Sequence, residues 1–219
     1  MTTQDVYRKF IFPATEARRC RYVELDHMRG ITGPASTFIS HCRGGTWGDL
    51  VAAVCDGDAD RSRRVWIDIF ACRQYPSSRP DLDFQYTIRH CSSFLVVCSS
   101  LKEVAELGTS RILSRLPKNI RDKIAFLRVE CLVEIYSATQ CKDMPIIMRG
   151  GSYRMINKNT FTFDHNREML KNMFLLIDIS KAEATVAKDK EDIPNLITYN
   201  GKDADGIKKL NIKVRGTIN

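Results

Sequence analysis

Short apolar runs that alternate with helix-like segments constrain the fold of this chain more than any other feature. Buried strands are predicted at residues 37–40, 64–70, 93–98, 144–148 and 173–179. Segments with helical spacing or helical character lie between them, at residues 46–54, 83–90 and 124–139. Short, mostly apolar strands that alternate with helices are typical of a parallel sheet covered on both faces. We therefore expect an α/β fold.

The chain is expected to form one main domain. Residues 1–33 form a polar lead-in that should pack against the body, and Gly33-Pro34 marks a turn after it. Residues 34–219 then form the α/β domain, which ends in a lysine-rich tail with helix-like spacing. The strand at 144–148 is expected to end at Gly150-Gly151.

The composition narrows the class of protein. Hydrophobic residues make up 43% of the 219 residues and charged residues 27%, as in ordinary globular proteins. No apolar run approaches the roughly 18 residues of a membrane span, and the N-terminus lacks a secretory pattern. We therefore expect a cytoplasmic protein without a membrane partner.

The eight cysteines are scattered singly, without a Cys-x-x-Cys pair. We expect most of them to be reduced, partly buried thiols that pack as small hydrophobic groups. The four histidines show no ligand-like spacing, so no metal site is predicted. The net charge of +8 is spread thinly and includes no basic helix with interleaved aromatic residues. This pattern favours an anionic small ligand, such as a dinucleotide, over nucleic acid.

Polar residues follow the first predicted strand in the run Ser40-His41-Cys42. Adjacent residues of an extended chain point to opposite faces, so His41 is poorly placed to act as a base for Cys42. Two other interpretations remain open. These residues form turn hydrogen bonds at a strand end, or they contact a ligand where the carboxyl ends of strands converge.

Asp68 is expected within the second apolar run, where a carboxylate is costly unless it is paired. We favour a salt bridge or hydrogen bonds that hold the following loop over direct catalysis. Gly44-Gly45 lacks the glycine pattern of a phosphate-binding loop. Trp47 beside it belongs either to a stacking surface or to the buried face of a helix. Glu134 is four residues from Glu130 on one helical face, and by itself it is a candidate surface carboxylate.

Five sequence boxes, taken in order, resemble the TIR (Toll/interleukin-1 receptor) domain family, and most closely the TIR-like domains of protists and algae. The boxes are Phe38-Ile39-Ser40-His41, Trp66-Ile67-Asp68, Phe94-Leu95-Val96-Val97, Cys131-Leu132-Val133-Glu134 and Pro145-Ile146-Ile147. The resemblance covers about residues 35–200 and includes the segment 177–185. The chain differs at Glu130, where the narrower group usually has Trp, and at Arg43 and Gly44, where a Trp is also usual.

The resemblance implies a flavodoxin-like three-layer sandwich with a five-stranded parallel sheet and helices on both faces. It also implies cleavage of NAD+ at the nicotinamide–ribose bond, with Glu134 as the catalytic residue and activity that depends on self-association. NAD+ would be the substrate, with no further cofactor. The expected ligand-contacting residues are Ser40, His41, Arg43, Trp47, Asp68 and Cys131.

Two other functions remain open. Some TIR domains are non-catalytic modules that act through TIR–TIR contacts, in which loop residues such as Arg73 and Arg79 would matter more than Glu134. A receiver-like domain is a weaker alternative, because Asp68 lacks the acidic partners of a phosphoacceptor site.

Overall fold

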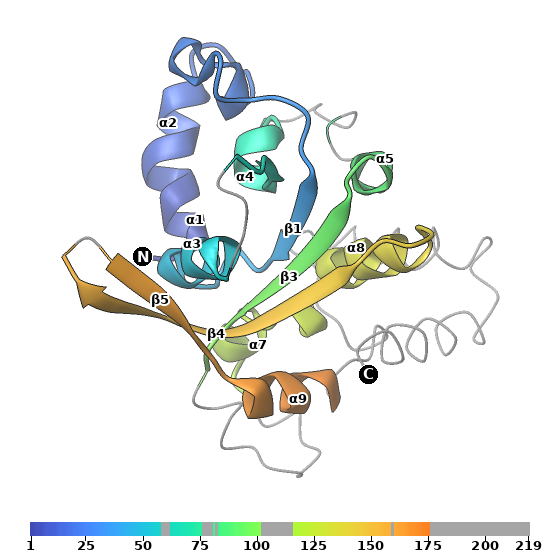
Figure 1. Ribbon diagram of the computed structural model, residues 1–219. Coiled ribbons are helices and arrows are strands. Elements are labelled where there is room, and N and C mark those ends of the chain that lie inside the picture. Colours follow the sequence, from blue (N-terminus) through green and yellow to red (C-terminus); the bar gives the residue numbers. More distant parts are fainter. Residues whose placement is uncertain (58–61, 76–80, 82, 102–115, 159, 176–219) are drawn as a thin grey trace.

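The computed structural model describes residues 1–57, 62–75, 81, 83–101, 116–158 and 160–175. These residues contain a five-stranded sheet with the strand order β2-β1-β3-β4-β5 (Figure 1). The strands are β1 (Thr37–His41), β2 (Val65–Trp66), β3 (Ser93–Ser99), β4 (Ile146–Asn157) and β5 (Thr160–His165). Strands β1 to β4 pair in parallel, and β5 is antiparallel to β4. This mostly parallel sheet, with helices around it, confirms the α/β prediction.

The sheet separates two hydrophobic clusters because side chains alternate along each strand. Phe38 and Phe94 point into the larger cluster, whereas Ile39 and Leu95 point into the smaller one. The larger cluster is covered by α5 (Phe84–Arg89), α7 (Lys118–Arg121), η6 (Ala125–Leu127), α8 (Val129–Thr139) and α9 (Arg167–Leu175). The smaller cluster is covered by α1 (Thr3–Val6), η1 (Tyr7–Ile11), α3 (Trp47–Cys55) and α4 (Asp68–Ala71). The result is three layers.

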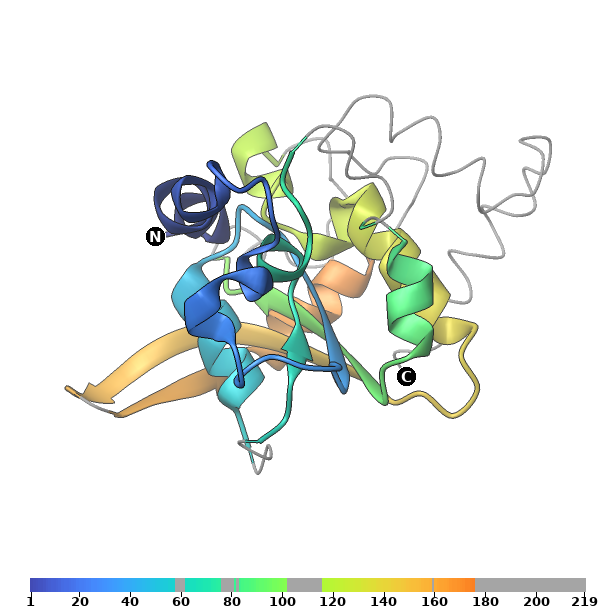
Figure 2. The same cartoon turned by 90° about the horizontal axis from the view of Figure 1, so that it is seen from above.

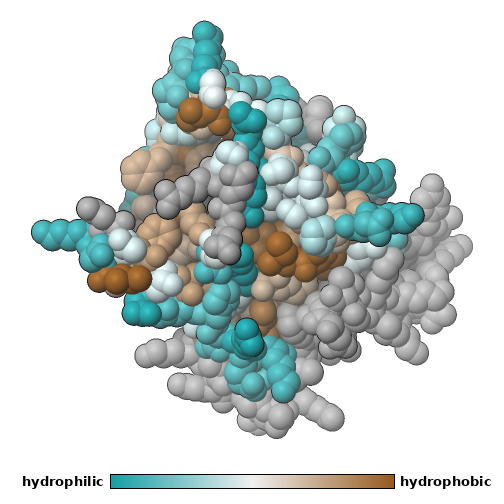
Figure 3. Space-filling model, viewed as in Figure 1, coloured by the Kyte–Doolittle hydropathy of each residue, from teal (hydrophilic) through white to brown (hydrophobic). Residues whose placement is uncertain are grey.

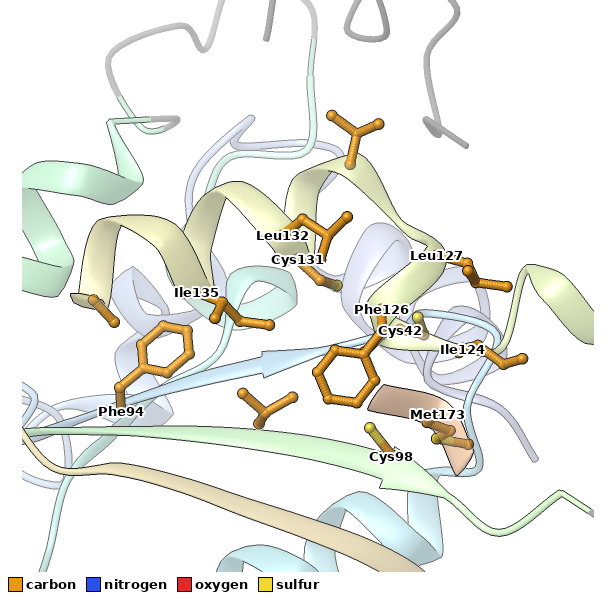
Figure 4. Packing of buried hydrophobic residues seen from close by; sticks show 14 of the residues in the cluster. Cys42, Phe94, Cys98, Ile124, Phe126, Leu127, Cys131, Leu132, Ile135 and Met173 are labelled. Atoms are coloured by element: carbon orange, nitrogen blue, oxygen red, sulfur yellow. The ribbon is translucent and has the colours of Figure 1, made fainter. Parts of the chain in front are cut away.

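Helix α8 packs against the parallel strands through its apolar face. Figure 4 shows Cys131 and Ile135 extending from α8 toward the strands, and the same cluster contains Phe94 and Cys98 of β3. All eight cysteines are free thiols, and five of them are buried, as expected for reduced thiols that pack in the core.

The N-terminal segment folds back on the smaller cluster. Val6 and Ile11 are buried there with Ile39 and Leu50. Three further short helices, α2 (Phe12–Thr15), η2 (Tyr22–Glu24) and η3 (Asp26–Met28), precede β1. Figure 2 shows these N-terminal helices beside α3, and it shows the β4–β5 hairpin projecting away from the body.

Three element predictions need correction. Strand β2 contains only Val65–Trp66, so Asp68 is the first residue of α4 and not a strand residue. Strand β4 does not end at Gly150-Gly151 but continues through both glycines to Asn157. A side chain at Gly151 would place its Cβ 2.2 Å from the carbonyl oxygen of Asp164, so here glycine permits close strand pairing.

The last strand also differs from its prediction. Residues 173–175 end α9, and residues 176–179 lie outside the described part of the chain. The edge strand is instead β5, whose sequence Thr-Phe-Thr-Phe-Asp-His alternates polar and apolar side chains. Such alternation is typical of a half-exposed antiparallel strand, and it differs from the continuous apolar runs of buried parallel strands. The predicted C-terminal helical tail also lies outside the described residues.

Candidate functional site

The strand-end site consists of Ser40, His41, Arg43, Asp68 and Glu134. Ser40 and His41 end β1, Arg43 lies in the loop after it, and Asp68 begins α4 just after β2. Glu134 comes from the middle of α8, which packs on one face of the sheet. Side chains that are far apart in sequence meet here because the carboxyl ends of neighbouring parallel strands lie at one edge.

Glu134 is a buried carboxyl group and not the surface carboxylate that its helical position alone suggests. Only 8% of the residue is exposed, and its Oε2 accepts a 2.6 Å hydrogen bond from the Ser40 hydroxyl. Burial, together with the charges of Asp68 and Glu130, raises the pKa of Glu134 to about 8, although the Ser40 hydrogen bond opposes this rise. At neutral pH Glu134 is therefore largely protonated.

Asp68 forms an ion pair with Arg43 beside Glu134. Arg43 donates to Asp68 Oδ2 from Nε at 3.0 Å and from Nη2 at 2.6 Å, and Nη2 also donates to Gln74 Oε1 at 3.0 Å. Burial acts to raise the pKa of Asp68, but the charge of Arg43 and its hydrogen bonds outweigh burial and lower it. Asp68 therefore stays ionised next to a largely neutral Glu134, and the predicted salt bridge is present.

His41 faces Asp68 without forming a hydrogen bond to it. Its Nε2 lies 3.8 Å from Asp68 Oδ1, and neither of these two buried atoms has a hydrogen-bond partner. Burial lowers the pKa of His41 and the charge of Arg43 lowers it further, although Asp68 opposes the shift. His41 is therefore neutral at physiological pH, and its ring can accept or donate a hydrogen bond to a group that enters the gap.

Cys131 lies behind the site in the hydrophobic core. Its Sγ donates to the His41 carbonyl oxygen at 3.6 Å. A hydrogen bond with Cys42, together with burial, raises the pKa of Cys131 well above its ordinary value. The protonated thiol is thus a packing group at the end of β1, and Figure 4 shows Cys131 and Cys42 among the residues of this core.

Trp47 lies apart from these groups. It is partly buried against the smaller cluster, and its ring packs edge-to-face on the Phe70 ring, with 5.9 Å between the ring centres. Arg73 also lies elsewhere, paired with Asp81, and Arg79 lies outside the described residues.

Two residues at this edge had no signal in the sequence. Thr3 and Tyr7 of the N-terminal segment reach the loop after β1, where the Arg43 guanidinium lies 5.4 Å from the centre of the Tyr7 ring. Ser99 could have been found, because it ends β3 as Ser40 ends the apolar part of β1. Its Oγ accepts a hydrogen bond from the Thr46 amide at 3.0 Å and so braces the loop.

Comparison with known proteins gives no family for this chain: no protein-family model, no curated protein and no solved structure matches it. Among the described residues, no helix has both the length and the hydrophobicity needed to cross a membrane. The chemistry of the strand-end site therefore has to carry the functional proposal.

Proposed function

We propose that this chain is a TIR-like NAD+ nucleosidase that cleaves the nicotinamide–ribose bond, with Glu134 as its catalytic carboxylate. The observation that carries the proposal is the 2.6 Å hydrogen bond from Ser40 to a buried Glu134 at the carboxyl edge of the sheet. Ligands of open α/β folds bind at this edge, and a carboxyl group with a strongly perturbed pKa there is a functional candidate. The resemblance of five sequence boxes to TIR domains supports the same assignment.

The proposed reaction places simple demands on the protein. NAD+ and water give nicotinamide, ADP-ribose and a proton, or the adenine captures the ribosyl group to give a cyclic product. Nicotinamide leaves as a neutral molecule, so its departure needs no general acid. Positive charge develops on the ribose, and a nearby carboxylate stabilises it. Glu134 must be ionised for this task, and the positive charge of bound nicotinamide favours that ionisation.

The neighbouring groups have supporting roles in this proposal. Arg43 carries a positive charge at the mouth of the site and suits the diphosphate of NAD+. Asp68 orients Arg43 through two hydrogen bonds to one oxygen. The same proposal includes an activity that depends on self-association. It also includes a cytoplasmic location, which is in keeping with the eight free thiols.

The test is nicotinamide release from NAD+ by the purified protein at high concentration. The wild type should release nicotinamide, and Glu134→Gln should abolish release because the amide cannot carry the charge. Glu130→Gln is the matched control: this carboxylate lies one helical turn away, and its removal should preserve or increase release, because the Glu130 charge raises the pKa of Glu134. A silent wild type, even when crowded on beads, would contradict the enzymatic function.

A second candidate function is a non-catalytic module that acts through protein contacts. The observation in its favour is a hydrophobic surface at the end of the β4–β5 hairpin (Figure 3), where Met155, Ile156 and Phe161 are 59%, 58% and 39% exposed. Such a module would tolerate Glu134→Gln. Its assembly, measured by light scattering, would be lost in Ile156→Lys, whereas Lys158→Ala on the same hairpin would preserve it.

A further inference from the structure

The first residues of the chain are bound to the loop that forms the mouth of the strand-end site. We call residues 1–7 the strap. The Thr3 amide donates to the Gly45 carbonyl at 3.0 Å, and the Gln4 amide donates to the Arg43 carbonyl at 2.8 Å. In the opposite direction, the Trp47 amide donates to the Met1 carbonyl at 3.0 Å. These backbone hydrogen bonds, with an antiparallel bridge between Thr2 and Thr46, attach the strap to residues 43–47.

The strap occupies positions that an anionic ligand needs. Trp47 is the first residue of α3, and a free amide at a helix N-terminus is a natural partner for a phosphate oxygen. Here the Met1 carbonyl oxygen takes that place. Arg43 is likewise engaged, because its guanidinium lies over the Tyr7 ring of the strap and bonds to Asp68 and Gln74.

The strap also leaves polar atoms unsatisfied beneath it. Thr3 is completely buried, and its Oγ1 has no hydrogen-bond partner. It lines a small hollow together with His41, whose buried Nε2 is also unpartnered. The hollow has room for about one water molecule, far less than a nucleotide. Unpaired buried polar groups cost free energy, which favours a state in which the strap leaves, so that water solvates Thr3 and a ligand can reach His41.

We propose that the strap is autoinhibitory: residues 1–7 hold the strand-end site closed, and NAD+ gains access only when they detach from residues 43–47. The proposal rests on the NAD+ nucleosidase function proposed above and adds its regulation. Because one equilibrium governs both events, a change that weakens the strap raises NAD+ cleavage by the same factor as the open population, while that population remains small.

Two full-length variants weaken the strap at points outside the strand-end site. Val6→Ala removes contacts with the smaller cluster, in which Val6 is 6% exposed. Thr2→Ala removes the N-cap of α1, where the Thr2 hydroxyl accepts from the Asp5 amide at 3.1 Å, without touching the core. Val54→Ala is the matched control, because Val54 packs on the same cluster from the far end of α3.

Hydrogen exchange and nicotinamide release are measured on the same samples. Thr3, Gln4 and Trp47 amides should exchange about fivefold faster in Thr2→Ala and about tenfold faster in Val6→Ala, and nicotinamide release should rise by matching factors. Val54→Ala should change neither. The autoinhibitory role of the strap would be overturned if nicotinamide release stayed unchanged in samples with faster exchange. It would also be overturned if amide exchange did not change in either variant. Both outcomes would leave the nucleosidase function intact. Faster exchange with no nicotinamide from any sample would instead overturn the nucleosidase function and, with it, the regulatory role.

Discussion

At the scale of single residues, Glu134 and Asp68 are two carboxyl groups in one site with opposite pKa shifts. Burial holds Glu134 largely protonated at neutral pH, whereas the charge and hydrogen bonds of Arg43 keep Asp68 ionised. Such a pair divides the chemical roles by environment and not by residue type. The pKa of Glu134 therefore becomes the quantity on which activity and stability both depend.

The activity of the proposed enzyme should rise with pH. The value of kcat/KM reports the free enzyme, in which Glu134 has a pKa of about 8. We expect kcat/KM to increase about tenfold per pH unit below that value and to level off above it. The value of kcat should level off at a lower pH, because bound NAD+ favours the carboxylate. A flat profile from pH 6 to 9 would exclude Glu134 as the ionising group.

Removing the Ser40 hydroxyl should shift this profile further toward alkaline pH. The Ser40 hydrogen bond lowers the pKa of Glu134 and so opposes burial. In Ser40→Ala the carboxylate loses a charge-assisted bond, and we expect kcat/KM at pH 7 to fall about ten- to a hundredfold. Activity should partly recover at pH 9. A uniform loss at every pH would show that Ser40 acts in another way.

Glu134 should also make the protein less stable as the pH rises. Its pKa is raised in the folded state from 4.5 to about 8, so between these values the unfolded chain releases a proton that the folded chain retains. Stability then falls as the pH rises through this range, by about 3 kcal/mol up to pH 7. In urea unfolding, the free energy of unfolding of Glu134→Gln should exceed that of the wild type most at pH 8. The difference should disappear near pH 4.5. An advantage that stays constant with pH would contradict the raised pKa.

The grouping of Ser40, His41, Arg43, Asp68 and Glu134 could be anticipated, because the ends of parallel strands must converge. The burial of Glu134 could not, since helical spacing does not show which way α8 faces. Thr3 and Tyr7 were missed for a different reason. Their place at the site depends on how the N-terminal segment folds back over the loop, and no local pattern encodes that contact.

At the scale of elements, the sequence predicted the bounds of strands and helices best where the apolar residues followed one clear pattern, either a continuous run or helical spacing. The apolar runs of β1 and β3 were located closely, and the segments predicted as helical at residues 46–54 and 83–90 correspond to α3 and α5. The predictions failed where tertiary contacts decide. Glycines that usually end strands lie inside β4, because there they let another backbone or helix come close.

Gly151 provides a test of this explanation. The Cβ of an alanine there would lie 2.2 Å from the Asp164 carbonyl oxygen and 3.0 Å from the Phe163 ring. We expect Gly151→Ala to reduce the free energy of unfolding by about 2 kcal/mol through overpacking, as measured by urea denaturation. Ser152→Ala is the neighbouring control and should change stability little. Equal stability of the two variants would mean that β4 and β5 can separate at little cost.

At the scale of the whole molecule, an ionic cluster joins the N-terminal lead-in to the loop after α4. The Asp81 side chain is completely buried between Arg21 of the lead-in and Arg73, which follows α4. It accepts two hydrogen bonds from the Arg73 side chain and one from the Arg73 amide. This cluster holds residues 1–33 against the body through residues other than those of the strap, so the two attachments can be tested separately.

The Asp81 cluster should therefore make a pH-dependent contribution to the stability of the whole molecule. Hydrogen bonds from Arg73 and Arg21 lower the pKa of Asp81 below its usual 3.8, although burial opposes the shift. The stabilisation is complete above pH 3.8 and is lost as the pH falls through the lowered pKa of the folded state. Because both arginines are more than one-third exposed, we expect Asp81→Asn to cost only about 1–2 kcal/mol at pH 7. The cost, measured by urea unfolding, should shrink below pH 3. If Asp81→Asn lowers the free energy of unfolding as much at pH 2 as at pH 7, the charge of Asp81 is not what holds the lead-in in place. The shape of its side chain would then be responsible.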